Sequence, residues 1–155
     1  MNGLHHTGLT VRDLDRSLAF YRDLLGMEVL FESEREGGYF GEIVGYPDCK
    51  VRIAHLELEE GGHRLELFQY LRPEPIGEPG ESRSIGITHV CVLVPDIDSV
   101  SERLANAGIS LSTPPVYVTE GANEGGYGLY LRDPDGIIVE LFQPPSGDAS
   151  PASGS

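Results

Sequence analysis

The sequence predicts an α+β fold in which one βαβββ module occurs twice in tandem, and three observations lead to this prediction. The tetrapeptide Glu-Leu-Phe-Gln ends both halves of the chain, at residues 66–69 and 140–143. Each half begins with a histidine on an apolar run typical of a strand, His6 or His89, followed by apolar residues at helical spacing. A chain of 155 residues, of which 39% are hydrophobic, can bury the core of two such modules.

The first module is expected to span residues 3–72. Its first strand is predicted over residues 4–11, and Asp13 follows as the N-cap of a helix. This helix stops at Gly26, and its apolar residues at helical spacing are Leu14, Leu18, Tyr21, Leu24 and Leu25. Three further strands are predicted after the helix, at residues 27–32, 51–58 and 64–70.

The second module is expected to span residues 86–145 and to repeat this plan. A strand over residues 87–94 precedes the N-cap Asp96, and the helix stops at Gly108. The apolar stripe of this helix consists of Ile97, Val100, Leu104 and Ala107. Three further strands are again predicted, at residues 117–119, 128–131 and 137–143.

The remaining segments have compositions typical of loops. Residues 73–85 are rich in proline and glycine and are expected to link the modules, while residues 146–155 are expected to form a disordered tail. Segments 36–49 and 119–128 contain several glycines. Each is predicted either to cover the mouth of a binding site or to be an ordinary connection. If they act as covers, their contacts are Tyr39, Tyr46 and Tyr127.

Composition narrows the classes of partner. A formal net charge of −14 repels a phosphate backbone, so nucleic acid is not expected to bind and a small molecule is the expected partner. Neither a membrane-spanning stretch nor a signal peptide is recognisable, which predicts a soluble, cytoplasmic protein. The two cysteines, Cys49 and Cys91, lack metal-type spacing and are expected to be reduced thiols.

Strand alternation places two histidines and two glutamates opposite the aliphatic faces of their strands. Glu66 and Glu140 alternate with leucines that are expected to face the helices, and His6 and His89 alternate with aliphatic residues in the same way. Ionisable groups on an inner face are costly unless a divalent cation compensates them. The sequence therefore predicts a metal site with these four ligands, provided that the two sheets curl toward each other.

The other histidines receive different predictions. His5 is out of phase with His6, and His63 follows a Gly-Gly turn, so both are expected to be structural or solvated. His55 shares the face of Glu66 only if the intervening hairpin has an even register. The sequence leaves that register open, and His55 is a candidate to contact a metal ligand rather than the metal itself.

At these residues the chain resembles the vicinal oxygen chelate superfamily. This superfamily includes glyoxalase I, methylmalonyl-CoA epimerase, extradiol dioxygenases and the fosfomycin and bleomycin resistance proteins. The resemblance covers residues 4–145 and rests on four groups of residues: 6–11 (HTGLTV), 15–26 (DRSLAFYRDLLG), His89 with 95–98 (PDID), and 133–141 (DPDGIIVEL). It implies that both modules form a cupped, mostly antiparallel sheet around a metal site with the ligands His6, Glu66, His89 and Glu140.

The residue at the second of the four ligand positions, Glu66, implies the class of chemistry. Members of the superfamily that have a carboxylate or amide at this position, such as glyoxalase I and the epimerase, use a four-ligand nonredox centre, and this chain is similar to them. This implies Zn, Ni, Co, Mn or Mg, and enolisation by an epimerase, isomerase or lyase with Glu140 or Glu66 as the base. Two alternatives stay open. One is an Fe(II) extradiol-type dioxygenase, a class that also enlists an extra histidine and a tyrosine. The other is a non-catalytic, bleomycin-type protein that binds an antibiotic.

The residues expected to contact substrate are Thr10, Phe68, Tyr70, Tyr127 and Phe142. Thr10 and Tyr70 stand where glyoxalase I typically has an Arg and an Asn that serve glutathione, so glutathione chemistry is not expected. Arg52 is predicted to bind a substrate carboxylate if its strand turns it inward, and otherwise to form a surface salt bridge. A homodimer is expected, and the cup forms either within one chain or by exchange of modules between two chains.

Overall fold

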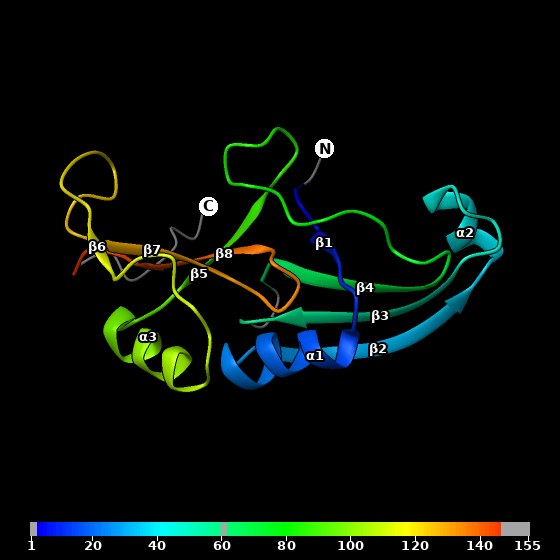
Figure 1. The fold of residues 1–155 in the computed structure, drawn as a ribbon, viewed down its shortest axis with the longest axis horizontal. Coiled ribbons are helices and arrows are strands. Elements are labelled where there is room, and N and C mark those ends of the chain that lie inside the picture. The colour runs from blue at the N-terminus through cyan, green and yellow to red at the C-terminus, as the bar shows by residue number, and fades with distance from the viewer. Residues whose placement is uncertain (1–2, 60–61, 147–155) are drawn as a thin grey trace. The chain divides into compact units, whose positions relative to one another are not determined.

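The structure, a computed structural model, describes residues 3–59 and 62–146 (Figure 1). The chain divides into two compact units, Met1–Glu78 and Pro79–Ser155. All but the first residue of the predicted tail, 146–155, lies outside the described residues. No helix in the described part of the chain is long and apolar enough to cross a membrane.

The first unit contains one mixed sheet of four strands. Its elements are β1 (His6–Thr10), α1 (Leu14–Leu18), the π-helix η1 (Ala19–Leu24), β2 (Glu28–Glu36), α2 (Gly38–Val44), β3 (Lys50–Glu57) and β4 (Arg64–Arg72). The strand order is β1-β4-β3-β2, in which β1 and β4 are parallel and the other neighbours are antiparallel. The first and last strands of the module therefore lie side by side at one end of the sheet.

The second unit repeats this topology. Its elements are β5 (His89–Leu93), α3 (Ile97–Asn106), β6 (Val116–Tyr117), β7 (Tyr127–Arg132) and β8 (Ile138–Gln143). The strand order is β5-β8-β7-β6, with β5 and β8 parallel and the remaining pairs antiparallel. The predicted α+β fold with two βαβββ modules is therefore confirmed.

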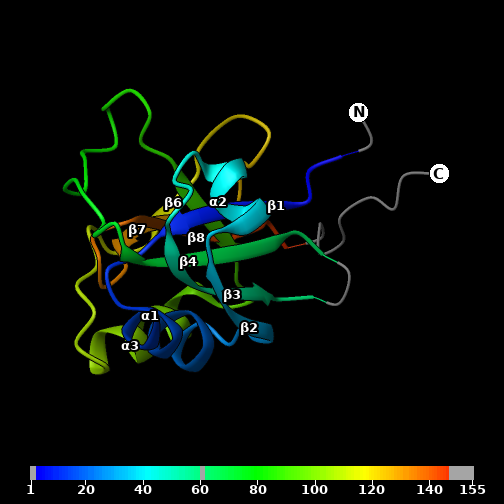
Figure 2. The same ribbon diagram turned by 90° about the vertical axis from the view of Figure 1, so that its right-hand side faces the viewer.

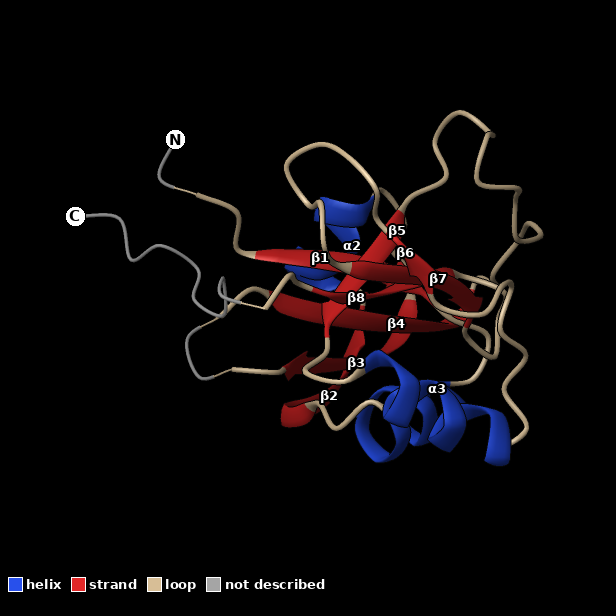
Figure 3. Cartoon of the chain, turned by 90° about the vertical axis from the view of Figure 1, so that its left-hand side faces the viewer, coloured by secondary structure: helices blue, strands red, loops and turns tan. Residues whose placement is uncertain are grey.

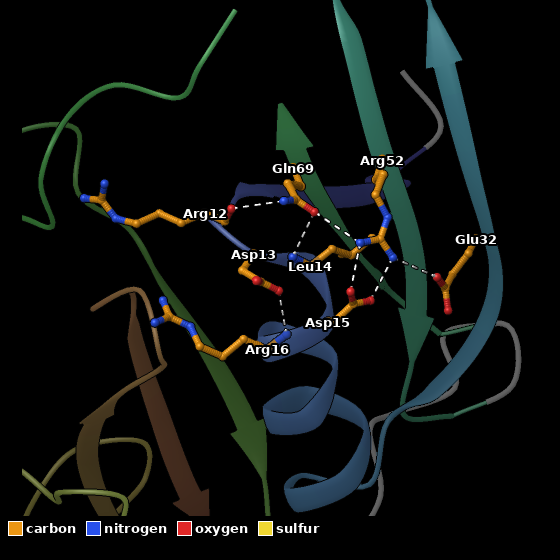
Figure 4. Close-up of polar contacts among 8 residues, drawn as sticks. All are labelled: Arg12, Asp13, Leu14, Asp15, Arg16, Glu32, Arg52 and Gln69. Carbon is orange, nitrogen blue, oxygen red and sulfur yellow. Dashed lines mark hydrogen bonds and ion pairs between the residues drawn. The ribbon is translucent and has the colours of Figure 1, made fainter. Parts of the chain in front are cut away.

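The repeated tetrapeptide has a structural role in both units. Its leucines, Leu67 and Leu141, are fully buried, and burying such a side chain contributes about 1.5–3 kcal/mol. Its last residue, glutamine, binds the start of the module's helix: the Oε1 atom of Gln69 accepts a hydrogen bond from the Leu14 amide at 3.2 Å, as Figure 4 shows. In the second unit, Gln143 Oε1 accepts from the Ile97 amide at 2.7 Å. Each module thus fixes its helix to its last strand through the same residue type.

Aspartate N-caps complete the helix starts, as predicted. Asp13 accepts a hydrogen bond from the Arg16 amide, and Asp96 accepts one from the Ser99 amide, both at 3.0 Å. Each helix lies along one side of its sheet, as Figure 3 shows for α3 and Figures 1 and 2 show for α1. The opposite face of each sheet carries the histidine and glutamate of the predicted site.

The prediction of an irregular loop over residues 36–49 is wrong, because this segment contains the helix α2. Phe40 and Val44, four residues apart on α2, pack against a buried cluster of Cys49, Val51 and Ile53. Burial of this pair stabilises a helix whose composition opposes it, since two of its seven residues are the glycines Gly38 and Gly41. Figures 1 and 2 place α2 on the side of the sheet opposite α1, where β2 and β3 are connected.

Candidate metal centre

The first unit brings His6 and Glu66 together, as the alternation predicts. β1 and β4 are parallel neighbours in which Gly8 lies opposite Glu66, so His6 is one alternation step from the glutamate on the same face. His6 Nε2 and Glu66 Oε2 are 3.0 Å apart, and the side chain of Glu66 is only 10% exposed. A carboxylate this buried needs a compensating partner on every oxygen.

His55 supplies the second partner of Glu66. The register of β3 and β4 places His55 directly opposite Glu66, which resolves the register that the sequence left open. His55 Nε2 lies 2.6 Å from Glu66 Oε1, and the imidazole stacks on Phe31 with ring centroids 4.3 Å apart. Burial lowers the pKa of His55, against the opposing effect of the Glu66 charge. The ring is therefore neutral at physiological pH, with its single proton on Nε2, directed at Glu66.

The other nitrogen of this ring, Nδ1, is buried and has no hydrogen-bond partner among the described residues. A bare acceptor in such a position is less costly than a bare N–H donor, which agrees with a proton on Nε2. His55 thus leaves one of its own atoms unsatisfied while it holds Glu66. The one hydrogen bond that the His55 ring makes with the residues that the structure describes is directed at Glu66, so this ring fixes the orientation of the carboxylate.

The second unit contains an equivalent pair with different neighbours. His89 Nε2 and Glu140 Oε2 are 3.0 Å apart. Glu140 lies opposite Cys91 on β5 and Tyr130 on β7, where the first unit has Gly8 and His55. The side chain of Glu140 is 24% exposed, more than twice the value for Glu66.

Cys91 and Tyr130 are both in their neutral forms beside Glu140. Partial burial raises the pKa of the Cys91 thiol to about 11, and the charge of Glu140 and a hydrogen bond to it add to the shift. Burial likewise raises the pKa of Tyr130, with a further contribution from Glu140. The Tyr130 ring lies 5.3 Å from that of His89, measured between centroids. Neither residue was singled out as a neighbour of Glu140 from the sequence. Strand pairing would have identified them had the registers been known.

The spacing of each pair fits a metal ion. Two ligand atoms that each lie about 2.1 Å from one ion, at a right angle, are ~3.0 Å apart, and both histidine–glutamate pairs have this separation. The same distance suits a hydrogen bond, so either state fits without rebuilding the strands. Among residues 3–59 and 62–146, no group of three or more His, Cys, Asp or Glu side chains is arranged to hold a metal. Each unit thus contains one histidine–glutamate pair, which is termed a half-site below.

The predicted substrate contacts of the first unit lie on the face of the half-site. Thr10 is exposed at the end of β1 and lies opposite Phe68 in the register. Phe68 and Tyr70 are half-buried and pack against the cluster beneath α2. Burial raises the pKa of Tyr70, so its hydroxyl stays protonated. This face is polar at His6, His55 and Glu66 and becomes apolar toward α2.

In the second unit, Tyr127 is 37% exposed, and its ring lies 5.2 Å from that of Tyr117. Phe142 is half-buried on the strand that carries Glu140. Phe142 shares the face of Glu140 by alternation along β8. Tyr127 lies opposite Gln143, whose side chain faces α3, so the register places Tyr127 on the other face of the sheet and does not support the predicted substrate contact.

The inward orientation considered for Arg52 is wrong, and the alternative of a salt bridge is confirmed. Arg52 alternates with His55 and so faces α1, where its guanidinium binds both carboxylate oxygens of Asp15 at 2.8 and 3.1 Å (Figure 4). The remaining histidines make local contacts. His5 Nδ1 lies 2.8 Å from His6 Nδ1, and His63 Nε2 lies 2.8 Å from the Thr7 hydroxyl.

A repeated βαβββ unit with a histidine–glutamate pair on the sheet face opposite its helix defines a class of two-module proteins. The sequence profile of the Glyoxalase/Bleomycin resistance protein/Dioxygenase superfamily matches residues 3–141, and the chain belongs to this superfamily. A solved structure of a glyoxalase family protein from Bacillus cereus has the same fold, with a TM-score of 0.83, 24% identity and coverage of 94% of this chain and 95% of that one.

Relatives with different names share similar levels of identity with the chain. A 2-epi-5-epi-valiolone epimerase from an Actinomyces species is 28% identical, covering 93% of this chain and 80% of that protein. The mitochondrial methylmalonyl-CoA epimerase of Bos taurus is 30% identical, with 90% and 73% covered. A Catechol-2,3-dioxygenase from Bacillus subtilis is 29% identical, and the chain spans 39% of its length.

Proposed function

We propose that this protein is a divalent-metal-dependent enzyme that enolises a small substrate with two neighbouring oxygen atoms, as an epimerase, isomerase or lyase. The observation that carries the proposal is the same histidine–glutamate pair, at 3.0 Å, in each of the two units. The similarity to two epimerases supports this class of reaction. A protein that only sequesters a ligand has no evident use for two such pairs.

His6, Glu66, His89 and Glu140 would hold the ion, with both pairs supplied by one chain or by two chains of a homodimer. Two neutral imidazoles and two carboxylates balance the charge of Zn, Ni, Co, Mn or Mg. When bound, the ion would supply Lewis-acid chemistry that stabilises an enolate.

The two carboxylates have different roles in this proposal. Both oxygens of Glu66 are engaged, one by His6 and one by His55, so Glu66 is held in one orientation as a ligand. Glu140 is more exposed and contacts a single histidine. We therefore assign Glu140 as the base, which accepts the proton from the substrate carbon on a carboxylate oxygen and returns it to the product. His55 is a positioning residue, because it acts through Glu66.

Substrate contacts are assigned to the face that carries the pairs. Thr10, Phe68 and Tyr70 on the first unit, with Phe142 on the second, would contact the organic part of the substrate. Thr10 and Tyr70 provide neither the guanidinium nor the amide expected for glutathione binding, so a different acyl or oxo compound is proposed.

A second candidate is an Fe(II) extradiol-type dioxygenase. The specific observation in its favour is His55, a buried imidazole 2.6 Å from the Glu66 carboxylate, together with Tyr130 opposite Glu140. Such dioxygenases enlist an additional histidine and a tyrosine. The carboxylate at the second ligand position opposes this candidate, because ring cleavage uses two histidines and one carboxylate.

Exchange of substrate hydrogen with solvent tests the proposal. The metal-loaded protein is incubated in D₂O with 2-oxo acids, acyl thioesters and 2-oxoaldehydes, and loss of the C–H signal next to the carbonyl is followed by NMR. We expect exchange in at least one class, abolished by Glu140→Gln and unaffected by Glu102→Gln, a matched change on the exposed side of α3. Oxygen consumption with catechols and no exchange would favour the dioxygenase instead.

A further inference from the structure

Arg64 lies on the same face of the first unit as the metal ligands. It begins β4 two residues before Glu66, so both side chains leave the strand on one side, about 6.6 Å apart along it. In the parallel register of β1 and β4, Arg64 lies directly opposite His6. The side chain is half-buried. Arg64 is therefore next to the half-site, where a substrate held by the metal ligands would extend.

Arg64 has no ion pair or hydrogen bond among the described residues, in contrast to most other basic side chains. Those that bind a carboxylate are Arg12, Arg22, Lys50, Arg52, Arg72 and Arg83. Two glutamates share the face of Arg64. The oxygens of Glu66 are already held by histidines, and Glu57, opposite Arg64 where the β3–β4 register continues, forms no ion pair with it.

The second unit has no counterpart of this charge. The residue opposite His89 in the equivalent register is Ile138, which is 4% exposed. The two half-sites therefore have the same two types of residue, histidine and glutamate, and differ in the residue beside them. The cation nearest to this position in the second unit is Arg132, opposite Ile138 on β7, and its guanidinium donates to the carbonyls of Gly80 and Gly136.

We propose that Arg64 binds a carboxylate of the substrate, which gives the substrate a fixed direction along the first unit. The inference rests on the proposed function and narrows it to oxo compounds with a second, distal carboxylate. A planar guanidinium binds a carboxylate through two parallel hydrogen bonds. A single cation in an acidic chain matches a monoanionic group better than a phosphate dianion.

Two five-carbon 2-oxo acids test this inference, because they differ only at the distal end. 2-Oxoglutarate has a distal carboxylate, whereas 2-oxopentanoate ends in a methyl group. Their affinities for the Mn²⁺-loaded protein are measured by isothermal titration calorimetry. We expect 2-oxoglutarate to bind about 10- to 100-fold more tightly. Arg64→Gln should remove this preference and leave 2-oxopentanoate binding unchanged, and Arg103→Gln on α3 serves as the control.

The outcomes separate this inference from the function on which it rests. Equal binding of both compounds, or a preference that survives Arg64→Gln, would overturn the role of Arg64 alone. Loss of binding of both compounds in Arg64→Gln would assign a structural role to the arginine and also overturn it. If neither compound binds the metal-loaded natural protein, the inference is overturned, while the proposed function is decided separately by the hydrogen-exchange assay with the other substrate classes.

Discussion

The hydrogen bond between His55 and Glu66 gives a prediction in which metal affinity and stability respond differently. Replacing His55 by Phe keeps an aromatic ring against Phe31 and removes the N–H group that donates a hydrogen bond to Glu66. The lost bond to a charged group is worth about 1.5–3 kcal/mol. The same change removes the buried Nδ1 atom, which lacks a partner among the described residues and costs about 1–3 kcal/mol.

Because these two contributions offset each other, we expect the free energy of unfolding of the metal-free protein to change by less than about 1 kcal/mol. The affinity for metal should fall in His55→Phe, since it depends on one orientation of Glu66. Loss of a residue that orients a ligand typically weakens metal binding about 10- to 100-fold. Competition with a fluorescent chelator measures the affinity, and urea denaturation measures the stability.

His55→Gln is the matched control, because the amide can still donate a hydrogen bond to Glu66 although the ring is lost. It should bind metal more tightly than His55→Phe. Unchanged metal affinity in His55→Phe would refute the assigned role. Weaker metal binding in His55→Gln than in His55→Phe would attribute the effect to ring packing rather than to the hydrogen bond.

Three further predictions concern the first unit. Gln69→Ala removes the acceptor for the first amide of α1 and should lower the free energy of unfolding by about 1 kcal/mol in urea denaturation. Gly8→Ala places a Cβ atom 3.0 Å from the Phe68 ring and should destabilise by about 1–3 kcal/mol in the same assay. Arg52 lowers the pKa of Asp15, so its stabilising effect is present above the usual pKa and disappears as pH falls through the lowered one. Arg52→Gln should therefore reduce the melting temperature at pH 7, and the difference from the natural protein should shrink as pH falls below the usual pKa of Asp15.

The repeated tetrapeptide allowed much of the fold to be predicted, because each of its positions has a separate physical reason. The glutamate belongs to the half-site, the leucine is fully buried, and the glutamine binds the first amide of the helix. Alternation in the strands then assigned His6 and His89 to the faces of the glutamates. These features depend on local periodicity, which a single sequence records directly.

Features that depend on strand register could not be predicted. His55 lies opposite Glu66 only because of the turn between β3 and β4, whose length does not determine the pairing. The same uncertainty concealed Tyr130 opposite Glu140. The helix α2 was missed for a different reason. Its glycines oppose a helix locally, and burial of Phe40 and Val44, a tertiary effect, decides the outcome.

The metal content of the purified protein tests the central claim most directly. Elemental analysis is made after reconstitution and removal of loosely bound ions, on the natural protein and on His6→Ala and His89→Ala. His5→Ala and His63→Ala are the controls. Two half-sites per chain predict close to one divalent ion per chain, lost in the first two variants and retained in the controls. Absence of bound metal in the natural protein, or full content in His6→Ala and His89→Ala, would contradict the account.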